Sequence, residues 1–187
     1  MKNLITRKQI RLPNYNYSTN GFYFITICTK NRENIFGDIP VGATGWPPDT
    51  SLPPDDTTGI QLNDFGRIVD EELKKSKFIR DEIILDQYVI MPNHIHCIIS
   101  ISSDNNAGGQ PATPTRGTLS SFVNGFKSAV TTRINTLRNM PGEPVWQRSF
   151  YDHIIRNKRS LNAIREYIQD NPLNWERDID NLLQTDL

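Results

Sequence analysis

Alternating and continuous runs of hydrophobic residues along the chain predict four β-strands. Residues 22–29 are aromatic, β-branched and nearly alternating, which is typical of a strand. Residues 83–91 and 94–101 form two apolar runs separated by a Pro-Asn pair that favours a turn, so we expect a hairpin. Residues 145–155 predict a further strand or strand-loop.

Two longer segments place hydrophobic residues at helical spacing. Residues 63–78 carry apolar positions between charged residues and begin at Asn63 or Asp64, both of which are good helix caps. Residues 119–137 are amphipathic, and their apolar side chains recur every three or four positions at Phe122, Phe126, Val130, Ile134 and Leu137. Both segments therefore predict helices that pack one face against the strands.

The order of these elements predicts an α+β fold. The sequence strand, helix, strand, strand, helix, strand is that of a ferredoxin-like domain. We expect an antiparallel sheet of four to five strands, with helices on one face and the histidine-bearing strand central. Residues 37–58 and 103–117 are rich in loop-forming residues, and we expect them to be flexible insertions in a single domain spanning residues 1–187.

The apolar runs of the chain indicate where the protein resides and whether its cysteines are reduced. No apolar run approaches the roughly 20 residues that span a bilayer, and the start of the chain lacks the apolar region of a signal peptide. We therefore expect a cytoplasmic protein with no membrane partner. Cys28 and Cys97 lie in apolar runs without metal-ligand spacing, which favours buried, reduced thiols.

Positive charge is unevenly distributed, although the formal net charge is zero. Bases outnumber acids in residues 116–165, and the N-terminus is also basic. These segments could together bind a phosphate backbone, or they could be solvated helix faces. Tyr15, Tyr17 or Trp146 could stack on unpaired bases, although packing of an N-terminal arm would also explain the two tyrosines. The candidate DNA-contacting residues are Arg11, Tyr15, Tyr17, Lys127, Arg148, His153 and Arg156.

Two of the chain's three histidines lie two positions apart in an apolar predicted strand. Side chains alternate between the faces of a strand, so His94 and His96 project together while Ile95 and Cys97 point the other way. Two imidazoles on one face can share a metal ion. The alternative is that they are polar residues on a solvated face, but the apolar flanks favour a functional site.

The last predicted helix, residues 160–170, carries a second set of candidate residues. Ser160 is a reasonable cap at its start, and Pro172 ends it. At 100° per residue, Tyr167 and Asn171 fall side by side along one edge of the apolar stripe. Tyr167 could equally be a half-buried packing residue and Asn171 a helix C-cap.

Five segments resemble the REP-associated tyrosine transposases, which belong to the single-tyrosine HUH transposases. The resemblance extends from about residue 7 to residue 175 and omits the two insertions. It is specific because the His-hydrophobe-His strand and the tyrosine helix occur together and in order. The segments are residues 11–17, 23–28, 88–96, 146–157 and 164–172.

This resemblance implies an HUH endonuclease and transposase architecture and a particular chemistry. His94, His96 and Asn171 would hold a divalent cation, Mg²⁺ or Mn²⁺, and Tyr167 would be the nucleophile. The enzyme would cleave and rejoin DNA through a 5′-phosphotyrosine intermediate, without ATP. The substrate would be single-stranded or hairpin DNA, and the active species either a monomer or a homodimer.

Several alternatives remain open at the level of the sequence. Tyr151 is a competing nucleophile, which we rank below Tyr167 because Ile155, four residues on, is no metal ligand. Free tyrosine has a pKa of about 10, so a base must take its proton, and His153 is a candidate that could also be structural or contact DNA. The rival classes are a non-catalytic nucleic-acid-binding module and a metal-dependent phosphodiesterase that activates water.

Overall fold

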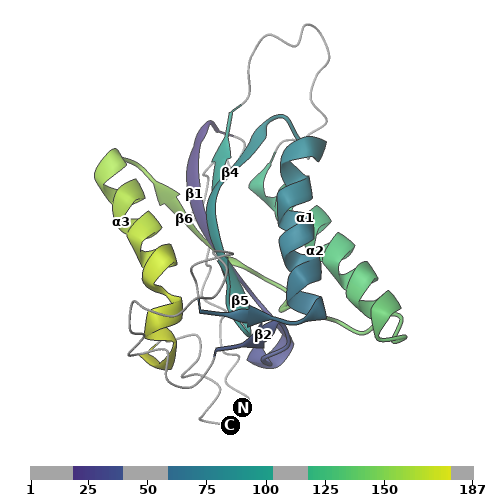
Figure 1. The fold of residues 1–187 in the computed structure, drawn as a ribbon. Coiled ribbons are helices and arrows are strands. Elements are labelled where there is room, and N and C mark those ends of the chain that lie inside the picture. Colours follow the sequence, from purple (N-terminus) through teal and green to yellow (C-terminus); the bar gives the residue numbers. More distant parts are fainter. Residues whose placement is uncertain (1–18, 40–58, 103–117, 178–187) are drawn as a thin grey trace, which may run out of the picture.

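Four antiparallel strands form the main sheet of the computed structural model, which describes residues 19–39, 59–102 and 118–177. The strands are β1 (Gly21–Cys28), β4 (Ile83–Ile90), β5 (His94–Ile101) and β6 (Tyr151–Ile155). Their order across the sheet is β4-β5-β1-β6, so the histidine-bearing strand β5 lies in the interior beside β1 (Figure 1). The predicted hairpin is confirmed, because β4 and β5 pair directly.

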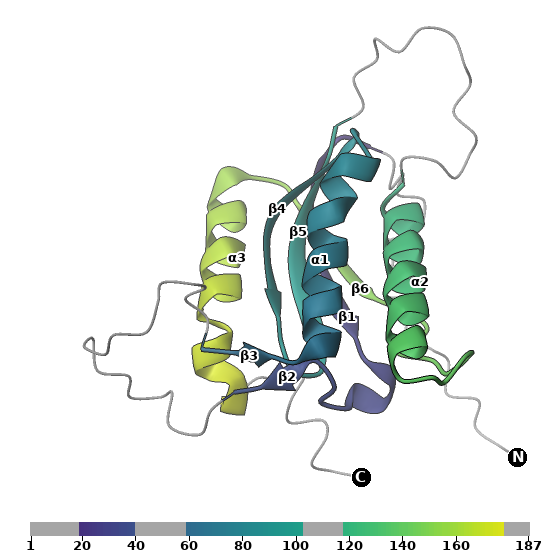
Figure 2. The same ribbon diagram turned by 45° about the vertical axis from the view of Figure 1, so that its right-hand side comes forward.

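Helices cover both faces of this sheet. Helices α1 (Asp64–Ile79) and α2 (Leu119–Leu137) lie on one face, and α3 (Lys158–Asp170) lies against the other (Figure 2). The connection β1-α1-β4-β5-α2-β6 is the ferredoxin-like arrangement, with α3 added after it. The predicted α+β fold is therefore confirmed, with the two crossover helices on one face and the tyrosine helix opposite them.

Alternation along the strands divides the core into two layers. Tyr23, Ile25 and Ile27 of β1 pack with α1 and α2 in the larger cluster of buried side chains. Phe24, on the other face of β1, joins a smaller cluster with Ile98 and with the apolar side of α3. The even-numbered residues of β5, including both histidines, therefore face α3.

Helix α3 begins two residues earlier than the sequence predicted. Asn157 is its N-cap, in place of Ser160, and accepts a 2.8 Å hydrogen bond from the backbone nitrogen of Ser160. The extended backbone of Asn157 (φ −152°, ψ 162°) aims its side-chain oxygen at the first turn, where asparagine caps as well as serine. At α1 the predicted cap is confirmed, since Asn63 accepts from the backbone of Phe65 and Gly66.

A small second sheet lies where the first insertion was expected to begin. Strand β2 (Gly37–Asp38) pairs with β3 (Gln61–Leu62), so the start of the predicted loop is a strand. Residues 40–58 and 103–117 lie outside the described residues, as do the chain ends. Over the described part of the chain, no helix is both long and apolar enough to cross a membrane.

The proposed stacking role of Trp146 is wrong. A β-bridge joins it to Thr29 and places its ring in the core, where only 8% of the residue is exposed. The ring packs against Phe36 and Phe126, at centroid distances of 5.1 and 5.8 Å. The prediction for the cysteines is confirmed, because Cys28 and Cys97 are buried free thiols.

Candidate active site

The two histidines of β5 meet on the sheet face that α3 covers. His94 is fully buried and His96 is 2% exposed. Their Nε2 atoms lie 3.0 Å apart, and the ring centroids are separated by 4.4 Å. The two-residue period of the strand thus converges two imidazole nitrogens on one point.

Two neighbouring polar side chains orient these rings. Nδ1 of His94 lies 2.7 Å from Oδ1 of Asn93, and Nδ1 of His96 lies 2.8 Å from Oγ1 of Thr26. Thr26 stands directly opposite His96 in the β1–β5 register, so the sheet itself sets that contact. With the amide oxygen as acceptor, His94 carries its proton on Nδ1 and leaves Nε2 with a lone pair.

Burial keeps His94 in the form that binds metals. Loss of solvation, assisted by the positive charge of Arg32, lowers the pKa of His94 to about 3. The ring is therefore neutral at neutral pH. A neutral imidazole with an oriented lone pair is the metal-binding form of histidine.

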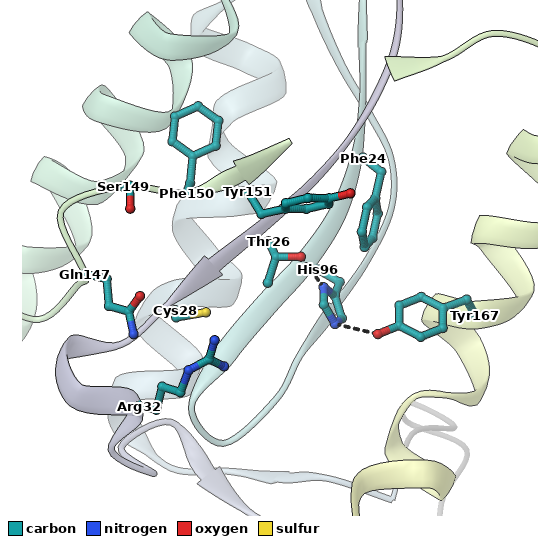
Figure 3. Close-up of a pocket in the computed structure, with 10 residues that line it drawn as sticks. All are labelled: Phe24, Thr26, Cys28, Arg32, His96, Gln147, Ser149, Phe150, Tyr151 and Tyr167. Atoms are coloured by element: carbon teal, nitrogen blue, oxygen red, sulfur yellow. Dashed lines mark hydrogen bonds between the residues drawn. The ribbon is translucent and has the colours of Figure 1, made fainter. Parts of the chain in front are cut away.

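Tyr167 brings a hydroxyl group from α3 to the histidine pair. Its hydroxyl oxygen lies 3.3 Å from Nε2 of His96 (Figure 3). The ring of Phe24 meets it edge-on at 6.0 Å, while 45% of the tyrosine remains exposed. A candidate nucleophile thus stands beside the histidines with an open side for a substrate.

Apolar packing and one ion pair hold α3 in this position. Leu161 and Ile168 enter the smaller core cluster, and Arg165 forms two hydrogen bonds with Asp86, of 2.9 and 2.7 Å. Asp86 lies where the register of β4 shifts against β5, between Leu85 and Gln87. Such an irregularity re-aims a side chain, here toward the helix that carries Tyr167.

Asn171, one turn after Tyr167, is the third predicted ligand. It is the C-cap of α3 and only 2% exposed, and its Oδ1 has no hydrogen-bond partner among the described residues. Four residues further on, the ring of Trp175 stacks on His94 at a centroid distance of 6.1 Å. Along the chain, Asn171 therefore lies between Tyr167, which contacts His96, and Trp175, which stacks on His94.

The separation of the two histidine nitrogens fits a divalent cation. Neighbouring ligands at about 2.1 Å from an octahedral ion are about 3.0 Å apart, which is the separation of the two Nε2 atoms. A buried amide oxygen without a hydrogen-bond partner, such as Oδ1 of Asn171, lowers the stability of the fold unless another group or an ion binds it. Within the described residues, no group of three His, Cys, Asp or Glu side chains could hold a metal ion, so a cation at the two histidines would need a donor of another kind.

A pocket of about 390 Å³ opens beside the tyrosine. It runs from His96 and Tyr167 across β1 to Arg32 and to the loop that precedes β6 (Figure 3). Arg32 and Thr26 were not predicted as site residues. A polar residue opposite a histidine in the neighbouring strand becomes recognisable only once the strand register is known.

The remaining predicted DNA contacts are dispersed. Arg148 and Arg156 are exposed in loops on either side of β6, and His153 is exposed on β6 itself. Lys127 instead donates 2.9 Å hydrogen bonds to the carbonyl oxygens of Gln147 and Ser149, and burial lowers its pKa to about 8. It therefore supports the wall of the pocket. Three more predicted contacts lie outside the described residues: Arg11, Tyr15 and Tyr17.

Comparison with known proteins identifies the fold first. No family model matches the chain. Its structure is similar to that of a REP-associated tyrosine transposase bound to a REP hairpin, with a TM-score of 0.54 and 18% sequence identity, over 92% of this chain and 87% of the other. The resemblance seen in the sequence motifs is thus confirmed at the level of the fold, which is that of a REP-associated tyrosine transposase.

A closer relative by sequence comes from Haemophilus influenzae (strain ATCC 51907 / DSM 11121 / KW20 / Rd). This uncharacterized protein is 38% identical over 182 residues, which cover 92% of this chain and 91% of the relative. The chain belongs to the same protein family as the Haemophilus influenzae protein.

Proposed function

We propose that the chain is a metal-dependent, single-tyrosine HUH transposase and endonuclease that acts on single-stranded or hairpin DNA. One observation carries the proposal: the hydroxyl of Tyr167 lies 3.3 Å from Nε2 of His96, which lies 3.0 Å from Nε2 of His94. A nucleophile next to a pair of metal-binding nitrogens suits phosphoryl transfer. The similar fold of a transposase bound to a REP hairpin supports this class of substrate.

In the proposed reaction, Tyr167 is the nucleophile. Its hydroxyl oxygen attacks the phosphorus of a DNA phosphodiester, so that an O–P bond to tyrosine forms and the P–O3′ bond breaks. The phenolic proton passes to water, and the 3′ oxygen takes a proton from water to become a free hydroxyl. The product is a 5′-phosphotyrosine, and a later attack by a 3′-hydroxyl reverses the step and joins two strands.

Three residues of the chain would hold the cation. The ligands are His94, His96 and Asn171, and a Mg²⁺ or Mn²⁺ ion bound there would polarise the scissile phosphate and offset charge that develops on it. Asn93 and Thr26 keep the imidazole rings in place. Formation of a homodimer stays a prediction.

The test is a search for a covalent adduct. The protein is incubated with a pool of labelled DNA hairpins that carry single-stranded extensions, with Mn²⁺, with Mg²⁺ or with chelator, and run on a denaturing gel. We expect an adduct that requires the metal. Cleavage with free ends and no adduct would point to a phosphodiesterase, and tight binding without cleavage to a non-catalytic module.

The ion pair between Arg165 and Asp86 should matter more for the rate than for the fold. Arg165→Gln removes both hydrogen bonds that hold α3 two residues before Tyr167. Misplacement of a nucleophile by a fraction of an ångström is costly, so we expect adduct formation to slow about tenfold. The measurement is the single-turnover rate, with the melting temperature taken in parallel.

Arg67→Gln is the matched control for this variant. It breaks an ion pair with Asp64, 3.0 Å long and also on a helix surface, but on α1 across the sheet. This variant should keep the full rate. If both variants slow the reaction equally, the Arg165 contact does not position the tyrosine.

A further inference from the structure

The pocket beside Tyr167 has one end that is aromatic. Tyr151 of β6 lines it with 48% of the residue exposed. The ring of Phe24 meets Tyr151 edge-on at 6.5 Å, and the same Phe24 ring meets Tyr167 at 6.0 Å. The aromatic surface is therefore continuous with the candidate nucleophile, and Tyr151 extends it away from the histidines (Figure 3).

The other end of the pocket is cationic. Arg32 points its guanidinium group into the cavity from the turn after β1 (Figure 3). Asn31 and Arg32 both have positive φ, of 54° and 57°, which is uncommon for arginine, and such conformations are enriched at functional sites. Arg32 brings a positive charge to the pocket, and none of the described residues that line it is acidic.

Hydrogen bonds from the sheet fix both walls. The backbone nitrogen of Thr29 donates to the carbonyl of Asn93 at 2.9 Å, which ties the Arg32 turn to the histidine strand. The nitrogen of Gln147 donates to the carbonyl of Cys28 at 2.9 Å, and Lys127 holds the carbonyls of the same loop. The pocket is preformed, and its volume of about 390 Å³ is in the range of small-molecule sites.

We propose that this pocket is a subsite for one unpaired nucleotide next to the scissile phosphate, with Tyr151 stacking on the base and Arg32 binding a phosphate. Aromatic rings stack on any base, and a guanidinium group pairs with phosphate oxygens. The assignment rests on the proposed function of the neighbouring site. It gives Tyr151 a role in substrate binding that does not depend on its hydroxyl.

The base contact is tested by combining abasic sites with variants of Tyr151. Binding is measured by fluorescence anisotropy in the Tyr167→Phe background, which prevents covalent attachment. The probe is a DNA hairpin with a single-stranded extension, in which each unpaired nucleotide is made abasic in turn. At one position, we expect loss of the base to weaken binding about tenfold when residue 151 is tyrosine or phenylalanine. In Tyr151→Ala, which has no ring to stack on the base, the same loss should weaken binding by less than twofold.

The phosphate contact is tested in the same way with neutral linkages. A methylphosphonate replaces each phosphate of the extension in turn, and Arg32→Gln is compared with the unaltered arginine. Near the abasic-sensitive position, we expect one linkage whose neutralisation weakens binding severalfold only when Arg32 is present. Arg67→Gln is the control, because Arg67 is exposed on α1 and outside the residues that line the pocket.

These binding measurements separate the subsite from the chemistry. The subsite is supported if the effect of a DNA change at one nucleotide depends on Tyr151 or Arg32, even if no adduct forms in the cleavage assay. Independent effects at every position, or no binding of any probe, overturn it. If the effects are independent at every position but a metal-dependent adduct still forms, the subsite is excluded and the proposed function is retained.

Discussion

Tyr167→Phe should abolish the covalent protein-DNA adduct and leave hairpin binding within about twofold of the unaltered protein. The variant keeps the ring that packs against Phe24 and His96 and removes only the hydroxyl group. Without the nucleophilic oxygen no phosphotyrosine can form, so the loss should be at least about a thousandfold. The measurement is the yield of adduct on a denaturing gel after a fixed time with Mn²⁺.

Tyr151→Phe is the informative comparison for this variant. Both tyrosines line the pocket, and both are about half exposed, at 48% for Tyr151 and 45% for Tyr167. Only Tyr167 has its hydroxyl beside the histidine pair. Tyr151→Phe should therefore form the adduct at close to the normal rate, and an adduct lost with Tyr151→Phe but kept with Tyr167→Phe would reverse the assignment.

His96→Ala should lower both Mn²⁺ affinity and adduct formation, each by at least about a hundredfold. Its Nε2 lies 3.0 Å from Nε2 of His94 and 3.3 Å from the hydroxyl oxygen of Tyr167. Removal of a group that only orients a metal ligand typically lowers metal affinity or activity about 10- to 100-fold, and removal of the ligand itself should lower them at least as much. Metal affinity is measured by calorimetry without DNA, so that the loss is not inferred from activity alone.

His153→Ala is the control for the metal site. His153 is exposed on β6 and is not part of the histidine pair, so its removal should leave Mn²⁺ affinity unchanged.

Asn171→Asp should retain the metal, because a carboxylate oxygen can replace the buried amide oxygen. Unchanged Mn²⁺ affinity in His96→Ala would contradict a metal site at the histidines.

Features that depend on local periodicity could be predicted from the sequence. The two-residue period of a strand placed His94 and His96 on one face, and the structure confirms that their rings meet. Strands, helices and the ferredoxin-like order followed from runs of hydrophobic residues with distinct periods. The tyrosine helix could be placed near the histidines only through the resemblance to a known family.

Features that depend on contacts between distant segments could not be predicted. Arg165 and Asp86 are 79 residues apart, and their contact requires a register shift in β4 that no sequence pattern announces. Trp146 was expected to stack on an unpaired base, as aromatic rings can, but the residue forms a β-bridge with Thr29 and is buried in the core. The hydrogen bonds from Lys127 to the carbonyls of Gln147 and Ser149 likewise depend on a distant loop that the sequence does not place.

The most direct test of the central claim is to locate the modified residue in the adduct by mass spectrometry. After nuclease trimming, trypsin releases Tyr167 in residues 166–177 and Tyr151 in residues 149–156, and each peptide contains no other tyrosine. We predict a nucleotide attached through its 5′-phosphate to Tyr167 in the first peptide. A nucleotide on Tyr151, or cleaved DNA with both peptides unmodified, would contradict the mechanism.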